Sequence, residues 1–417
     1  MSRAKPTKQH LEWADMEIGV IIHYLMESYN PDFKAYKTDA VRTELSPDRF
    51  NPMKLDPEQW VRSAYELGAK YAVFVANHCT GFSLWQTKVN DYSCASMKWK
   101  DGKGDVFREF VDACKKYGIK PGVYYSTGCN GYYNINDEVK HDYSADYYKN
   151  YVKSVERQVE ELWSEYGDMF EIWFDGGIIP KELGGPDIYP LLKKYQPNAL
   201  AFQGPSGYEH NIRWVGNENG FAPENCWAAW NYDENERHGS PDGDKWEPAE
   251  TDFPNRANDS FGGGWAWKAG EEDKVFTPEH LLDCYVKSVG RNTNMLIGMA
   301  ISTDGDFQDE QQFIDFGRLL KKTFSNPVYE TTNYKGDTLT IKFNKTNSVK
   351  YLVLCEDITK GHNITDYTVF ADGKEIFNGQ CIGHKRIIPL NGLSADEITV
   401  KVNKSFSDPI FKKITIY

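Results

Sequence analysis

The sequence predicts an α/β protein, a (β/α)8-like TIM barrel with some irregular members, followed by a C-terminal antiparallel β-sandwich domain. Short apolar runs recur about 50 residues apart in the first half, and stretches with helical periodicity separate them, which is typical of βα units. Beyond residue 326 the pattern changes to alternating and β-branched segments. We therefore expect a barrel over residues 1–325 and a β domain over 326–417.

The apolar runs predict the barrel strands. The clearest runs cover residues 19–24, 71–76, 119–126 and 170–174. Weaker runs predict later strands at residues 199–203, 213–215 and 294–299. The intervening segment 228–268 is polar and rich in glycine and tryptophan, and we expect it to form a long structured loop.

Capping signals predict the helices between these strands. Asp56, Pro57 and Glu58 are typical of a helix start, and Gly68 of its end. Similar patterns predict helices over residues 105–117, 144–166, 277–290 and 307–323.

The C-terminal segment predicts short strands at residues 338–343, 350–355, 368–370 and 398–402. Asp372-Gly373 and Asn391-Gly392 are turn signals between them. We expect this domain to cover the barrel; an independent sugar-binding role is the alternative.

The composition excludes some partners. The 417 residues carry a net charge of −13, which argues against nucleic acid and anionic membranes as partners. Aromatic residues reach 14%, including 12 Trp and 26 Tyr. Flat aromatic faces stack on the apolar faces of sugars, although many of them also serve as ordinary core. Nothing in the sequence indicates the oligomeric state.

Cofactor, metal and membrane signals are missing from the sequence. The eight cysteines form no CxxC pair, so we expect neither a disulfide framework nor a zinc site, and most should be small buried residues. The sequence has no HExxH, P-loop or strand-linked GxGxxG pattern, and we expect no cofactor and no metal. No run approaches the about 18 apolar residues of a membrane span. Residues 1–9 do not resemble a signal peptide, so we expect a cytoplasmic protein, or a periplasmic or secreted one if a leader has been removed.

One segment carries the strongest chemical signal. The apolar run at residues 170–174 ends on Asp175, which two glycines follow. A carboxylate at the end of a barrel strand lies where barrel enzymes place their catalytic groups. A capping aspartate in a strand-to-helix turn is the alternative.

The segments at residues 68–85, 172–176 and 213–220 together resemble family 29 glycoside hydrolases, the α-L-fucosidases. The segment 172–176 resembles the nucleophile motif of that family, and residues 213–220 resemble the acid/base segment of the subgroup that cleaves α-1,3/1,4-linked fucose. Further similar segments follow the family order, at residues 99–106, 122–126, 246–250 and 288–292. The resemblance implies a fucosylated oligosaccharide or glycan as substrate.

The resemblance assigns the two catalytic carboxylates. It implies Asp175 as nucleophile and Glu218 as acid/base of a retaining α-L-fucosidase. Such enzymes place the two carboxyl groups about 5–5.5 Å apart, on either side of the scissile bond. Glu247 and Glu250 compete for the donor role, because Trp246 and Pro248 would give either one a partly apolar setting. We expect Glu250 to be a substrate-site residue instead.

The remaining expected site residues contact the sugar. The resemblance implies that His23 and His78 bind fucose hydroxyls. Trp85, Trp173 and Trp265 are candidate stacking surfaces, and Tyr125 is a candidate hydroxyl partner; each of these aromatics could equally be ordinary core.

The chain also departs from the family pattern. The family shows two adjacent histidines after the second strand, where this chain has His78 and Cys79, and a thiol is a poor hydrogen-bond former. The family's Glu-Trp pair is not evident, and Glu27 or Glu44 could replace its glutamate. Two alternatives therefore stay open: the same chemistry on a related sugar such as an α-L-galactoside, and a fucose-binding barrel without catalysis.

Overall fold

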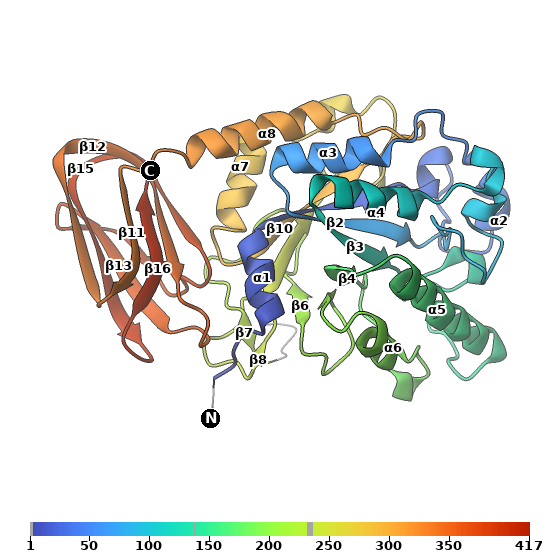
Figure 1. Ribbon diagram of the computed structural model, residues 1–417, viewed down its shortest axis with the longest axis horizontal. Helices are drawn as coiled ribbons and strands as arrows, with labels where there is room; N and C mark the ends of the chain where they lie inside the picture. The colour runs from blue at the N-terminus through green and yellow to red at the C-terminus, as the bar shows by residue number, and fades with distance from the viewer. Residues whose placement is uncertain (1–2, 137–138, 232–236) are drawn as a thin grey trace.

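The computed structural model describes residues 3–136, 139–231 and 237–417. Within these residues, eight parallel strands close a barrel in the order β1-β10-β9-β6-β5-β4-β3-β2 (Figure 1). This arrangement confirms the predicted barrel. The strands are β1 (Ile18–His23), β2 (Tyr71–Asn77), β3 (Lys120–Tyr125), β4 (Glu171–Trp173), β5 (Leu200–Phe202), β6 (Asn211–Trp214), β9 (Ala249–Phe253) and β10 (Asn294–Ala300).

The segment 228–268 is not simply a loop, and this prediction was wrong in part. It contains β9, which completes the barrel between β6 and β10, and a short hairpin of β7 (Ala229–Trp230) and β8 (Lys245–Trp246). The sequence pattern does not predict β9, because Glu250 and Asp252 lie two positions apart on it. These two inward-facing carboxyl groups give the segment a polar pattern. Residues 232–236 of this segment lie outside the described residues.

Helices surround the barrel, and their caps match the predicted signals. The side chain of Asp56 accepts a hydrogen bond from the Gln59 backbone N–H, and Gly68 ends the same helix in the left-handed conformation. The helices are α1 (Lys8–Met16), α2 (Val41–Glu44), α3 (Pro57–Leu67), α4 (Val106–Tyr117), α5 (Asp146–Glu165), α6 (Ile188–Tyr195), α7 (Pro278–Lys287) and α8 (Glu310–Thr323). The sequence prediction did not include α1, α2 or α6. Short 3-10 turns occupy the loops: η1 (Met26–Tyr29), η2 (Pro47–Arg49), η3 (Cys94–Ser96), η4 (Trp99–Gly102), η5 (Gly131–Tyr133), η6 (Lys181–Leu183), η7 (Phe261–Gly264) and η8 (Glu272–Lys274).

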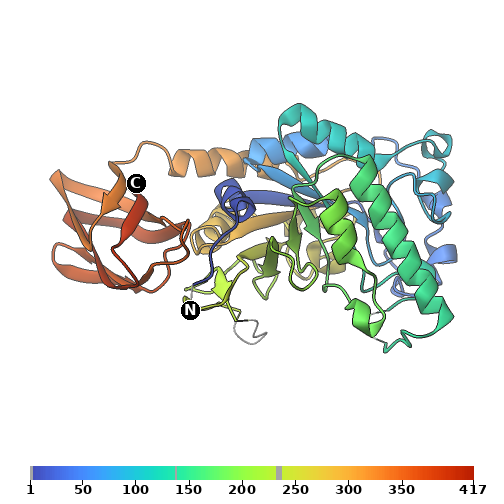
Figure 2. The ribbon, with the colours of Figure 1, turned by 60° about the horizontal axis from the view of Figure 1, so that its bottom comes forward.

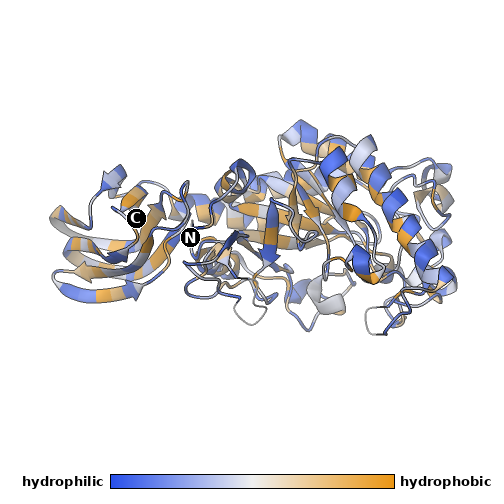
Figure 3. Ribbon diagram, turned by 90° about the horizontal axis from the view of Figure 1, so that it is seen from below, coloured by the Kyte–Doolittle hydropathy of each residue, from blue (hydrophilic) through white to orange (hydrophobic). Residues whose placement is uncertain are grey.

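Two apolar cores hold the barrel together. The larger core lies between the strands and the surrounding helices, and includes Trp60, Phe74 and Phe110. The smaller core fills the barrel interior with Val73, Phe202 and their neighbours. Figure 3 shows hydrophobic colour concentrated on the strands and hydrophilic colour on the outer faces of the helices. Burial of these apolar side chains is the main stabilising contribution to such a fold.

The C-terminal strands form an antiparallel six-stranded sheet in the order β11-β16-β12-β15-β13-β14. They are β11 (Tyr329–Lys335), β12 (Thr338–Glu356), β13 (Ile364–Ala371), β14 (Lys374–Gly379), β15 (Arg386–Ser405) and β16 (Ile410–Ile416). The long strands β12 and β15 bend where their register shifts, so the sheet wraps around its own core in the manner of a sandwich (Figures 1 and 2). This confirms the predicted β-sandwich class.

Two turn signals of this domain had different outcomes. Asp372 and Gly373 both have positive φ and join β13 to β14 in a hairpin, as predicted. Asn391 and Gly392 also have positive φ, but they lie within β15 and mark its bend. The predicted strands 338–343 and 350–355 are accordingly parts of the single strand β12.

The cysteine prediction needs one correction. Cys79 and Cys129 form a disulfide between the loops that follow β2 and β3. No spacing pattern predicts this bond, because the two residues are 50 positions apart and meet only through the barrel topology. The other six cysteines are free and buried, as predicted: Cys94, Cys114, Cys226, Cys284, Cys355 and Cys381.

None of the described helices combines the length and the apolar character needed to span a bilayer.

Candidate active site

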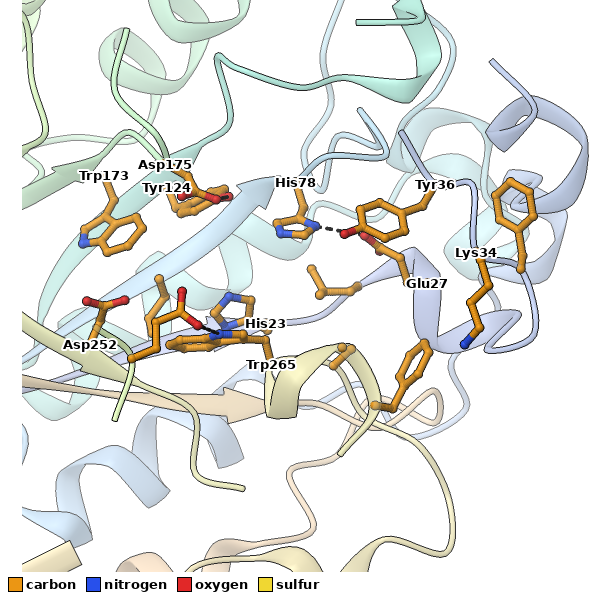
Figure 4. Close-up of a pocket in the computed structure, with 17 residues that line it drawn as sticks. His23, Glu27, Lys34, Tyr36, His78, Tyr124, Trp173, Asp175, Asp252 and Trp265 are labelled. Atoms are coloured by element: carbon orange, nitrogen blue, oxygen red, sulfur yellow. Dashed lines mark hydrogen bonds and ion pairs between the residues drawn. The ribbon is translucent and has the colours of Figure 1, made fainter. Parts of the chain in front are cut away.

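A cavity of about 290 Å³ opens at the end of the barrel where the strands terminate. Its wall includes six of the predicted site residues, at its closed end and rim: His23, His78, Trp173, Asp175, Glu218 and Trp265. The wall also includes Glu27, Lys34, Tyr36, Tyr124 and Asp252, several of which Figure 4 labels. Four carboxyl groups and one lysine therefore line this cavity.

Asp175 lies directly beyond β4. Glu171, Trp173 and Asp175 alternate along this strand and point into the barrel, so Asp175 is the outermost of the three. Gly176 and Gly177 follow with φ of 69° and 79°, a backbone conformation that favours glycine and turns the chain away from the strand. The Tyr124 hydroxyl donates a hydrogen bond of 2.8 Å to Asp175 Oδ2.

Glu218 lies in a tight turn after β6. Gly216 and Gly220 flank the turn with positive φ, and Asn217 accepts a hydrogen bond from the Asn219 backbone N–H. The Trp265 indole N–H donates to Glu218 Oε2 at 3.0 Å. Asp175 and Glu218 thus come from the ends of two different strands and reach one cavity.

Two histidines line the cavity, and their surroundings shift their pKa values in opposite directions. Burial, with the charge of His78 as a smaller cause, lowers the pKa of His23 to about 3, so His23 is neutral. Burial alone would lower the pKa of His78 too, but the hydrogen bond and the charge of Glu27 raise it above the usual value. His78 Nδ1 lies 2.9 Å from Glu27 Oε1.

Aromatic rings form the closed end of the cavity. Trp173 stacks on Phe202 with ring centres 3.7 Å apart and on Tyr124 at 5.6 Å. Trp265 lies against His23 with ring centres 4.9 Å apart. These indole rings provide flat apolar surfaces beside the polar groups, an arrangement that suits a sugar ring.

Trp85 and Tyr125 do not line the cavity. The Trp85 indole N–H donates to Glu161 at 3.1 Å, and the Tyr125 hydroxyl donates to Gln158 at 2.7 Å, both on α5. Both side chains are fully buried between the strands and the helices. Their predicted contact with substrate is therefore corrected: they belong to the core, the alternative that the sequence had left open.

Glu250 lies below the cavity, in the barrel interior. It is fully buried and accepts hydrogen bonds from the Tyr71 hydroxyl at 2.7 Å and the Trp173 indole at 2.9 Å. Burial raises the pKa of Glu250, and burial together with the charge of Glu250 raises the pKa of Glu171 beside it. The predicted substrate contact of Glu250 is replaced by a role in holding Trp173.

Glu247, the other competitor for the donor role, also lies outside the cavity wall. It accepts a hydrogen bond from the Trp230 indole at 2.9 Å, next to the short β7–β8 hairpin. Burial raises the pKa of Glu247. Geometry therefore leaves Glu218 as the cavity-lining candidate among the three glutamates.

Several cavity residues were missed by sequence reasoning. Tyr124 precedes the predicted Tyr125, and only the strand register decides which of the two faces inward. Asp252 belongs to β9, which the sequence did not indicate. Tyr36 lies in the loop after β1, which carries no regular pattern. In the described part of the chain, no cluster of three or more His, Cys, Asp or Glu side chains is arranged to hold a metal ion.

Comparison with known proteins agrees with this geometry. Residues 4–322 match the sequence model of the α-L-fucosidase family. The chain belongs to the α-L-fucosidase family. It is 26% identical to α-L-fucosidase 1 of Arabidopsis thaliana, over 99% of this chain and 87% of the plant protein.

Solved structures of similar proteins share the whole fold. A candidate α-L-fucosidase from Bacteroides thetaiotaomicron has a TM-score of 0.91 and 31% identity, over 100% of this chain and 99% of that one. A glycoside hydrolase 29 family member from an unknown rumen bacterium has a TM-score of 0.84 and 30% identity, over 100% of this chain and 77% of that one.

The structure shows where the residues at the two departures from the fucosidase pattern lie. Glu27 lines the cavity and pairs with His78, whereas Glu44 is exposed on α2 outside it. Cys79, at the position of a second histidine, is tied to Cys129 and does not line the cavity. In this chain one imidazole, from His78, is therefore available from that loop.

Proposed function

We propose that this protein is an exo-acting, retaining α-L-fucosidase that removes terminal α-L-fucosyl residues from glycans by double displacement. The observation that carries the proposal is the approach of two carboxylates, Asp175 and Glu218, to one cavity from the ends of β4 and β6. Buried side chains fill the barrel interior beside this cavity, so the cavity suits the terminal sugar of a chain better than a chain that passes through the barrel.

The mechanism assigns one role to each carboxyl group. Glu218 gives its proton to the glycosidic oxygen while Asp175 attacks the anomeric carbon, so the C–O bond breaks and a glycosyl-enzyme ester forms. Glu218 then takes a proton from water, and the resulting nucleophile cleaves the ester. The anomeric configuration is inverted twice and is therefore retained.

The hydrogen bonds of the two groups support these roles. The Tyr124 hydroxyl stabilises and orients the Asp175 carboxylate while leaving its second oxygen open for attack. Burial and then the charge of Asp175 raise the pKa of Tyr124 well above its usual value, so Tyr124 remains a proton donor. Trp265 orients Glu218 in the same way.

The histidines and indoles support recognition of the sugar. Neutral His23 has one donor and one acceptor nitrogen on its ring, and His78 donates its Nδ1–H to Glu27, which leaves Nε2 of His78 for a sugar hydroxyl. Trp173 and Trp265 provide surfaces for the apolar faces of the ring.

A panel of aryl α-L-glycosides tests the proposal. We expect hydrolysis of the α-L-fucoside with release of the α-anomer first, as followed by proton NMR. Faster hydrolysis of the α-L-galactoside would move the activity to that related sugar. Binding of L-fucose without turnover of any aryl glycoside would contradict the proposal and favour a binding protein. The resemblance of residues 213–220 to the subgroup that cleaves α-1,3/1,4-linked fucose supports a preference for these linkages, which oligosaccharides with α-1,3-, α-1,4- and α-1,2-linked fucose test.

We also propose that the protein works in an oxidising compartment, either periplasmic or extracellular. The disulfide between Cys79 and Cys129 supports this location, since such bonds persist mainly outside the cytosol. Fractionation of the source cells, with thiol labelling of the recovered protein, tests it; a reduced, cytosolic protein would contradict it.

A further inference from the structure

Asp252 is a third carboxyl group near the catalytic pair, and the mechanism does not use it. It lies on β9, is 2% exposed and lines the same cavity as Asp175 and Glu218. Figure 4 shows it at the closed end, between Trp173 on one side and Trp265 with His23 on the other. It therefore faces the volume that a sugar ring would occupy.

The hydrogen bonding of Asp252 is incomplete. Among the described residues, no donor reaches Asp252 Oδ1, and this oxygen is buried. Glu250, two positions earlier on the same strand, accepts two side-chain hydrogen bonds. A buried oxygen without a partner is costly, and at the wall of a binding cavity a ligand group can supply the missing partner.

The surroundings of Asp252 also favour its neutral form. Burial, and then the negative charges of Glu218, Glu250 and Asp175, raise the pKa of Asp252 well above its usual value. A neutral carboxylic acid has both an O–H donor and a C=O acceptor. A sugar hydroxyl likewise both donates and accepts, so the two groups are complementary.

We propose that Asp252 is a specificity-determining residue whose carboxyl group hydrogen-bonds one hydroxyl of the sugar ring held between Trp173 and Trp265. The inference rests on the proposed function for the identity of the sugar. It predicts that the protein distinguishes a sugar with this hydroxyl from the otherwise identical deoxy sugar. A site built to hydrogen-bond a hydroxyl rejects the analogue that lacks it, because its own polar group is then left unpaired.

The test compares substitutions at Asp252 with deletions of single hydroxyls from the substrate. The substrates are an aryl α-L-fucoside and its 2-, 3- and 4-deoxy analogues, and the proteins are the wild type, Asp252→Leu, Asp252→Ala and Asp252→Asn. We expect Asp252→Leu and Asp252→Ala to lower kcat/KM on the parent substrate about 10- to 100-fold. Asp252→Asn should lose less than about 10-fold, because an amide keeps a donor and an acceptor.

The decisive readout is non-additivity. On the deoxy substrate that lacks the hydroxyl bound by Asp252, the kcat/KM of Asp252→Ala should be no lower than its kcat/KM on the parent substrate. On the other two deoxy substrates, the loss of kcat/KM from the substitution and the loss from the missing hydroxyl should add. Asp315→Ala, a change of an exposed aspartate on α8, is the matched control and should leave all four values unchanged. Additive losses for all three deoxy substrates, or an unchanged kcat/KM in Asp252→Ala, would overturn the proposal.

Calorimetric titration separates this proposal from the proposed function. Binding of L-fucose and its deoxy analogues to the wild type and Asp252→Ala should show the same non-additivity for one hydroxyl. If no aryl glycoside is hydrolysed, the proposed function fails, but this titration still decides the role of Asp252. Additive binding losses throughout would contradict that role even in an active enzyme.

Discussion

Two pairs of carboxyl groups lie in this barrel, and their contrast explains how the site works. Asp175 and Glu218 are exposed at the mouth, whereas Glu171 and Glu250 are completely buried in the interior. Strand β4 contributes one member to each pair, because Glu171 and Asp175 lie four positions apart on the same face. Each pair consists of carboxyl groups and takes one member from the line of β4, so depth in the barrel is what separates the two pairs.

The two pairs also differ in their hydrogen bonds. In the interior, Glu250 uses both oxygens to hold Tyr71 and Trp173, and Glu171 accepts a hydrogen bond from the Trp13 indole at 3.0 Å. At the mouth, Asp175 and Glu218 accept one side-chain hydrogen bond each from the described residues. A reactive carboxylate needs an oxygen that remains open to substrate, and the mouth pair keeps one. The interior pair positions the cavity wall.

The largest expected effect comes from the nucleophile. Asp175→Asn should lower kcat/KM on an aryl α-L-fucoside by about 10⁴-fold or more, because no glycosyl-enzyme ester can form. Steady-state kinetics measures the loss, and an unchanged thermal unfolding curve serves as the control for folding. A variant that keeps ordinary kcat would remove Asp175 from the mechanism.

The next effect comes from the acid/base. Glu218→Ala should lower kcat/KM by about 10²- to 10⁴-fold, and the loss should be smaller for aryl groups that leave without protonation. Azide should restore turnover and yield a glycosyl azide, because a small anion can replace water in the second step without base assistance. An unaffected rate would return the donor role to one of the other glutamates.

The interior pair should affect stability more than chemistry. Glu250→Ala leaves the Tyr71 hydroxyl and the Trp173 indole N–H without their partner, and should lower the free energy of unfolding by about 2–4 kcal/mol. Urea denaturation measures this change. Glu250→Gln keeps an acceptor and should lose less; equal losses in the two variants would show that these hydrogen bonds do not stabilise the fold.

The smallest expected effect is a pH dependence. Burial and then Glu250 hold the pKa of Glu171 well above its usual value of 4.5, so folded Glu171 keeps its proton where the unfolded chain has lost it. Since the unfolded state then binds fewer protons, stability falls as pH rises above about 4.5, by up to about 1.4 kcal/mol per pH unit for one proton. The fall from this group ends once pH passes the folded pKa.

Glu171→Gln removes this titration and keeps a neutral side chain of similar shape. The free energy of unfolding of this variant should fall less steeply above pH 4.5 than that of the wild type, as followed by urea denaturation across a pH series. Identical slopes in the two proteins would mean that Glu171 is ionised in the folded state.

The sequence predicted most of the fold because its signals are local. Alternating apolar runs and helix caps such as Asp56 and Gly68 identified seven of the barrel strands and the main helices. Strand β9 was missed because a strand that carries two inward-facing carboxyl groups does not look apolar. The disulfide of Cys79 with Cys129 depends on which loops the topology brings together, and local pattern carries no such information.

The site could be predicted where a residue ends a strand, and less well elsewhere. His23, Asp175 and Glu218 all line the cavity as expected. The sequence predicts Tyr125 where the structure places Tyr124 in the cavity wall, because adjacent strand residues face opposite sides and a shift of one residue exchanges core for cavity. The expected substrate contact of Glu250 is wrong for a related reason. Depth along a strand decides whether a carboxyl group reaches the substrate, and the sequence does not show that depth.

Trapping the intermediate tests the central claim most directly. A 2-deoxy-2-fluoro-α-L-fucosyl fluoride should label the protein once, since the fluorine slows hydrolysis of the ester more than its formation. Mass spectrometry of the digested protein should locate the label on the peptide that contains Asp175, and its ester should turn over slowly. A label on another carboxylate, or rapid release of the β-anomer without any label, would contradict the account.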